Sequence, residues 1–177
     1  MKRDHFWRVK TALAGLAISG AFAFPGGAAQ AQSMTNTANV NISSAVTIQK
    51  DDDLRFGDII PGTTTSRFRV DPVTAAITQP AGDATHVGGS VSTAKFTISG
   101  TPLLRVRLTF GANRIFLTRV GGTEQLRVNR FRRDGPANRF LDAAGKATYA
   151  VGAQLRVFPT AVAGTYTGSF NVTVDYF

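Results

Sequence analysis

Side chains that commonly carry out catalysis are scarce in this chain. Its 177 residues include no cysteine and two histidines, and Glu124 is the sole glutamate. Because His5 lies in an N-terminal segment that we expect to be removed, a nucleophile-base-acid set would depend on His86, in a glycine-rich stretch. The sequence Gly88-Gly89-Ser90-Val91-Ser92 lacks the second glycine of a G-x-S-x-G motif. We therefore expect no catalytic residues and no enzyme activity.

The sequence contains no convincing metal-binding or cofactor-binding motif. The acidic run Asp51-Asp52-Asp53 is consecutive, and neighbouring carboxylates converge on one ion only in an unusual turn. We interpret it as a solvated turn ahead of a strand. The chain contains no phosphate loop, Cys-His zinc spacing or dinucleotide fingerprint. We expect neither a metal nor a cofactor.

The arginines are the clearest candidates for ligand-binding residues. Five arginines fall within thirteen residues and are interleaved with Phe131 and Phe140. They are Arg127, Arg130, Arg132, Arg133 and Arg139. Such a cluster is a candidate patch for an anionic polysaccharide or lipopolysaccharide; nucleic acid fits an exported protein less well, and we expect none as a partner. The alternative is a solvated surface, because arginines on the wet face of strands keep sheets soluble and discourage edge association.

The N-terminal residues have the pattern of an export signal. Lys2, Arg3, Arg8 and Lys10 precede the mostly apolar run Thr11 to Phe24, and Ala29-Gln30-Ala31 provides small residues for cleavage before Gln32. The apolar run, of about fourteen residues, is short of the roughly 20 needed to span a bilayer. We expect 1–31 to be removed, and the protein to pass through the periplasm to the cell surface or the extracellular space.

The mature chain is long enough for one domain. Its net charge falls from +9 to +6, because the signal contains four basic residues and one acidic residue. Residues 32–39 are small, polar and uncharged, so we expect 32–44 to be a flexible arm. Residues 45–177 then form the domain.

Alternating apolar and polar residues predict strands throughout that domain. The pattern is clear at 67–70, 94–99 and 104–110, and Gly121-Gly122 predicts a hairpin between 115–120 and 124–130. Residues 71–89 are rich in proline and glycine, which indicates a long connection with a short strand at 75–78. Many short strands and no long helix favour an antiparallel β-sandwich or a small barrel.

The last fourteen residues carry the strongest strand pattern. One parity is apolar apart from a glycine: Tyr166, Phe170, Val172, Val174 and Tyr176. This predicts one long, half-buried strand whose free edge needs a partner. The opposite parity, shared with Phe177, is polar, which argues against the outward apolar band of an integral outer-membrane protein. Ala38, Val40 and Ile42 alternate in the same way, so 35–43 is a candidate donor strand.

Two sets of residues resemble known families. Gly164 and Tyr176 are the fourteenth residue from the end and the penultimate tyrosine, as at the C-terminus of chaperone-usher pilus subunits. The segments Leu54-Arg55-Phe56-Gly57-Asp58-Ile59, Ala94 to Gly100 and Val151 to Tyr176 resemble a bacterial exported family known as domain of unknown function 4402. That family is similar in pattern to spore-coat-U-type and fimbrial subunits. The absence of cysteine departs from the many pilins that carry a disulfide.

The resemblance implies an all-β, antiparallel, immunoglobulin-like sandwich that is pilin-like and lacks one strand. It further implies a structural or adhesive subunit of a fimbria-like surface assembly, with a periplasmic chaperone, an usher and neighbouring subunits as partners. Such a subunit would donate its N-terminal strand to the groove of the next. The alternative is a self-complete secreted module that binds anionic surface glycans or lipopolysaccharide.

Overall fold

The computed structural model describes residues 45–177. The predicted signal peptide and N-terminal arm, including Ala38, Val40 and Ile42, lie outside these residues. Within them the chain forms thirteen strands and no helix, and every pair of neighbouring strands is antiparallel. The predicted all-β, antiparallel class is therefore confirmed. The described residues contain no helix long and apolar enough to cross a membrane.

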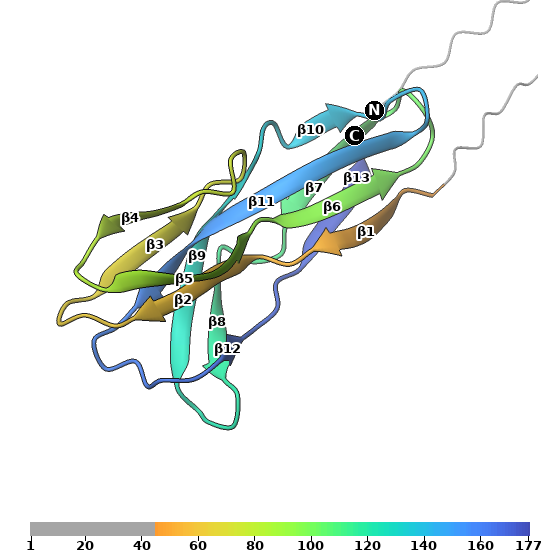
Figure 1. Ribbon diagram of the computed structural model, residues 1–177. Coiled ribbons are helices and arrows are strands. Elements are labelled where there is room, and N and C mark those ends of the chain that lie inside the picture. Colours follow the sequence, from red (N-terminus) through yellow and green to blue (C-terminus); the bar gives the residue numbers. More distant parts are fainter. Residues whose placement is uncertain (1–44) are drawn as a thin grey trace, which may run out of the picture. The chain divides into compact units, whose positions relative to one another are not determined.

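The strands follow one another along the chain with short connections (Figure 1). In order they are β1 (Thr47–Asp52), β2 (Arg55–Ile60), β3 (Ser66–Val70), β4 (Ile77–Ala81), β5 (Thr85–Ser92), β6 (Ala94–Ser99), β7 (Arg105–Phe110), β8 (Arg114–Arg119), β9 (Gln125–Arg133), β10 (Asn138–Phe140), β11 (Lys146–Val157), β12 (Tyr166–Thr167) and β13 (Val172–Tyr176).

The largest sheet is organised around β11, the longest strand. Its order is β1-β6-β11-β9-β8-β12, with β3 and β4 as a branch. One side of β11 pairs with β6 over 146–151 and with β3 over 154–157. The other side pairs with β9. Two smaller sheets complete the domain, namely β10-β7-β13 and the pair β2-β5.

Two apolar clusters hold these sheets together. Leu155 and Val157 of β11 pack with residues of β2, β3 and β9 in the first cluster, whereas Tyr149 and Val151 pack with residues of β6, β7 and β13 in the second. Because alternate residues of a strand share a face, the core-facing residues of β11 serve both clusters. β11 thus contributes buried residues to both apolar clusters.

The predicted hairpin at Gly121-Gly122 is present between β8 and β9. Gly121 has a φ of +74°, a conformation that glycine adopts without a side-chain clash. Arg119 and Glu124 close the turn, with Nε and Oε2 2.7 Å apart. The hydrogen bond from Arg119 lowers the pKa of Glu124 to about 2.

Two segments differ from the sequence-based prediction. Residues 71–89 contain β4 at 77–81, which overlaps the short strand predicted at 75–78, and also the start of β5, which was not predicted. His86 lies in β5 opposite Ile59. The prediction of a single strand over 166–176 is wrong. β12 pairs with β8 in the large sheet, whereas β13 pairs with β7 in another sheet, and 168–171 lie in neither.

Candidate strand-binding groove

A groove of about 980 Å³ opens onto the apolar core. Two segments form what we call the rims of the groove. One consists of residues 50 and 52–61, which include β2, and the other consists of residues 161–170, which include β12. The floor of the groove consists of apolar side chains from both clusters: Phe56, Ala94, Phe96, Ile115, Leu117, Leu126, Val128, Leu155 and Val157. Most of these floor side chains are buried, whereas Ile115 and Leu117 are partly exposed.

The strands at the rims have a strand partner on one side. Among the described residues, β2 pairs with β5 alone and β12 pairs with β8 alone. Ile60 and Val162, one from each rim, are 56% and 45% exposed. An unpaired strand edge beside an apolar channel is the arrangement to which an extended peptide can add by backbone pairing.

The terminal segment contributes to this groove in its first half. Gly164, Tyr166 and Phe170 line it, and the Tyr166 hydroxyl donates a 2.7 Å hydrogen bond to the Val162 carbonyl. The Phe170 ring lies 4.9 Å from that of Phe131 and 6.2 Å from that of Phe96. These contacts fix the rim although 168–171 form no strand.

The second half of the segment closes the other end of the domain. Val174 is buried, whereas Val172 is half-buried. The hydroxyl of Tyr176 accepts a 2.7 Å hydrogen bond from the Thr101 backbone N–H. Tyr176 thus ties the end of the chain to the turn after β6, and the predicted edge residues Val172, Val174 and Tyr176 serve the core away from the groove.

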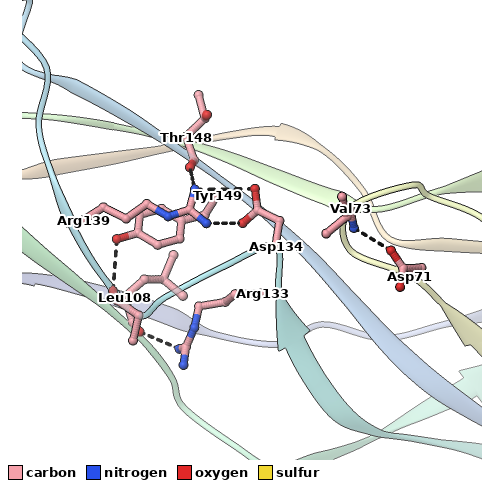
Figure 2. Close-up of polar contacts among 9 residues, drawn as sticks. Asp71, Val73, Leu108, Arg133, Asp134, Arg139, Thr148 and Tyr149 are labelled. Atoms are coloured by element: carbon pink, nitrogen blue, oxygen red, sulfur yellow. Dashed lines mark hydrogen bonds and ion pairs between the residues drawn. The ribbon is translucent and has the colours of Figure 1, made fainter.

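Two of the five clustered arginines have partners inside the domain. Figure 2 shows Arg139 with Asp134, at 2.6 Å, and with the Thr148 carbonyl. Its guanidinium also lies over the Tyr149 ring, 4.3 Å from the centroid. Arg133 donates a 2.8 Å hydrogen bond to the Leu108 carbonyl. The guanidinium groups of Arg133 and Arg139 are thus held by contacts within the domain.

The other three arginines of the cluster lie on β9. Arg130 has a φ of +54°, and the adjoining β9–β11 pairing shifts register between Gly152 and Gln154. Past the shift, Arg132 lies opposite Gly152 of β11. Arg127 instead lies directly opposite Arg156 of β11, an arrangement that sequence spacing could not reveal.

The residues weighed for catalysis and metal binding remain apart. Asp52 and Asp53 form exposed ion pairs with Lys95 and Lys50, and Asp51 accepts a hydrogen bond from Thr97. The Nε2 atom of His86 is buried without a hydrogen-bond partner. No group of three potential metal ligands exists within residues 45–177.

One comparison with known proteins is informative. A family model described as "Domain of unknown function (DUF4402)" matches residues 46–176. The chain belongs to this family. The match spans nearly every described residue of the DUF4402 domain, including both rims of the groove. No curated protein and no solved structure matches the chain significantly.

Proposed function

We propose that this DUF4402 protein is a structural or adhesive subunit of a fimbria-like cell-surface assembly. In this proposal the domain is an immunoglobulin-like sandwich that lacks one strand, and an extended segment of a neighbouring copy fills the groove. Export through the periplasm and delivery by a chaperone and an usher are part of the same proposal. The similarity of the sequence motifs to fimbrial subunits is one support.

The groove is the observation that carries the proposal. The apolar side chains of Ile60 and Val162, which line the groove, are 56% and 45% exposed, and apolar surface in contact with water costs about 25 cal/mol for each Å². A strand with apolar residues at every second position would cover this surface and pair with a rim. Residues 35–43 offer Ala38, Val40 and Ile42 in that pattern.

Donation between copies makes a fibre, because each subunit gives one surface and receives a different one. Such head-to-tail contacts do not close on themselves unless the rotation between subunits happens to form a ring. The groove of the last subunit stays open for the next. The alternative within the same geometry is insertion of the arm into the groove of its own chain, which would leave a self-complete monomer.

Disulfide trapping distinguishes these arrangements, since the chain has no native cysteine. Val40→Cys combined with Ile59→Cys in one chain places one thiol in the candidate donor and one in the groove. Donation between copies should give a ladder of oligomers on a non-reducing gel. Val40→Cys with Val73→Cys is the matched control, because Val73 is 73% exposed and lies outside the groove. A cross-linked monomer, or equal ladders for the two pairs, would contradict the proposal.

A further inference from the structure

Three arginines occupy one cross-strand row on the large sheet. Arg67 of β3 lies opposite Arg156 of β11, and Arg156 lies opposite Arg127 of β9. Side chains directly opposite on antiparallel strands have Cβ atoms about 4.5–5.5 Å apart, and like charges in such positions are destabilising. The row is extended by Phe116 of β8, opposite Arg127.

The next row along the strands adds two more arginines. Arg69 of β3 lies opposite Gln154 of β11, which lies opposite Asn129 of β9, and Arg114 of β8 completes the row. The alternate residues of these strands, such as Phe68, Leu155 and Val128, are buried in the first cluster. Both rows therefore lie on the face of the sheet that points away from the core. We call the five residues Arg67, Arg69, Arg114, Arg127 and Arg156 the arginine face.

The charges of the arginine face are not neutralised within the domain. Across residues 45–177, the ion pairs use Lys50, Arg55, Lys95, Arg119 and Arg139, and none involves a member of this face. Arg114 and Arg156 lie over the rings of Phe116 and Phe158, at 5.7 and 5.1 Å. Stacking holds these guanidinium groups in place without cancelling their charge.

Three polar atoms at the centre of this face lack hydrogen-bond partners. The Nε atoms of Arg127 and Arg156 and the Oε1 atom of Gln154 are buried and unpaired. Gln154 itself is 4% exposed. Buried polar groups are paired in most proteins, and each exception requires an explanation. Here unpaired groups and adjacent like charges coincide at one place.

We propose that the arginine face binds a linear anionic polysaccharide. Guanidinium groups match planar carboxylate and tetrahedral sulfate groups with paired hydrogen bonds. Neighbouring strands lie about 4.8 Å apart, so Arg67, Arg156 and Arg127 span roughly 10 Å. A linear polysaccharide with repeated anionic groups could contact all three cations at once. The half-exposed Phe116 ring provides an apolar surface for the C–H face of a sugar, and the Asn129 amide can bond hydroxyl groups.

This chemistry favours a glycan over nucleic acid. Single-stranded nucleic acid is commonly held by several aromatic rings on which successive bases stack. Of the exposed aromatic residues in the described chain, Phe116 is the one on β3, β8, β9 or β11. The arginine face also points away from the groove whose floor includes Leu155 and Val128, so strand donation would leave it free in an assembled fibre.

Binding of the full-length protein to heparin, a linear sulfated polysaccharide, tests the inference. The variant Arg67→Gln/Arg127→Gln/Arg156→Gln should bind heparin about tenfold or more weakly at low salt, and the dependence of log Kd on log salt should become shallower by about two to three. The control Arg55→Gln/Arg105→Gln/Arg107→Gln removes the same charge from exposed positions on the two smaller sheets. It should change the affinity by less than about threefold.

A second measurement separates a binding site from a structural role. Without heparin, the arginine-face variant should unfold at an equal or higher temperature than the wild type, because repulsion between adjacent cations is removed. Equal loss of affinity in the two triple variants, no heparin binding by the wild type, or a lower melting temperature of the arginine-face variant would overturn the inference. Tighter binding to single-stranded DNA of the same charge would overturn it in favour of nucleic acid.

Discussion

Arg139 illustrates how a charged residue in a basic cluster can have a purely internal role. Its guanidinium bonds Asp134 and the Thr148 carbonyl and stacks on Tyr149 (Figure 2). The Tyr149 hydroxyl in turn donates a 3.0 Å hydrogen bond to the Ala137 carbonyl, and burial raises the pKa of Tyr149. Arg139 thereby provides a hydrogen-bond donor to the Thr148 carbonyl, in the part of β11 that does not pair with β9.

Replacement of Arg139 should therefore affect stability rather than ligand binding. We expect Arg139→Gln to lower the free energy of unfolding by about 1–3 kcal/mol, since the bonds to Asp134 and Thr148 are lost together. Arg132→Gln, at an exposed position of β9, should change it by less than about 0.5 kcal/mol. Urea denaturation measures both. Equal midpoints for the two variants would show that the Arg139 contacts do not stabilise the domain.

Asp83 should control part of the acid stability. It accepts hydrogen bonds of 2.6–2.9 Å from the hydroxyls and the backbone N–H groups of Thr63 and Thr64. These bonds, led by the Thr63 hydroxyl, hold the pKa of Asp83 far below its usual range. A carboxyl whose folded pKa is lowered stabilises the fold above its unfolded pKa of about 3.9, and this contribution is lost as the pH falls.

Asp83→Asn should lower the thermal midpoint at neutral pH and flatten its decline between about pH 5 and pH 2. Asp175→Asn, at an exposed position of β13, controls for the general change in charge. Thermal unfolding followed across this pH range provides the measurement. A pH profile of Asp83→Asn parallel to that of the wild type would contradict the assignment.

At the scale of elements, the terminal segment shows what a period of two can and cannot predict. The inward positions at Tyr166, Phe170 and Val174 follow from alternation, and all three are at least partly buried. Alternation does not say which strand pairs with which. The chain leaves β8 after Thr167 and joins β7 at Val172, and this change of sheet depends on the position of distant strands.

The same limit applies to the candidate site. The strand residues and the family could be predicted from local motifs, and so could a free edge beside apolar residues. The groove floor could not, because it combines Leu117, Leu126 and Leu155 from three strands. Nor could the arginine face, since Arg67, Arg127 and Arg156 are adjacent only through the register of β3, β9 and β11.

Phe170 tests the importance of the broken part of the terminal segment. Its ring packs against Phe96 and Phe131 but is half-buried, so Phe170→Ala should cost about 1–3 kcal/mol, less than the 3–5 typical of a fully buried phenylalanine. The neighbouring Asn171→Ala, at an exposed position, should be nearly neutral. If denaturant midpoints show no loss for Phe170→Ala, the aromatic cluster does not hold this rim.

At the scale of the whole molecule, the two sides of one sheet are suited to different partners. The inner face of β8, β9 and β11 floors the groove, and the outer face of the same strands carries the arginine face. A subunit could therefore join its neighbours through one side and contact an anionic surface through the other. Repetition along a fibre would then multiply weak glycan contacts into strong attachment.

Assembly itself should depend on the parity of the N-terminal arm. In the proposed complex Ile42 enters an apolar pocket, so Ile42→Asp would bury a charge without a partner and should block assembly. Asn41→Asp introduces the same charge at the opposite parity and should assemble normally.

Deletion of 32–44 should also prevent fibres, while all three variants keep the thermal midpoint of the isolated domain. Size-exclusion chromatography and electron microscopy, with any neighbouring chaperone co-expressed, provide the readout. Fibres that survive the deletion would exclude the arm as the donor, and a wild type that stays monomeric would favour a self-complete binding module.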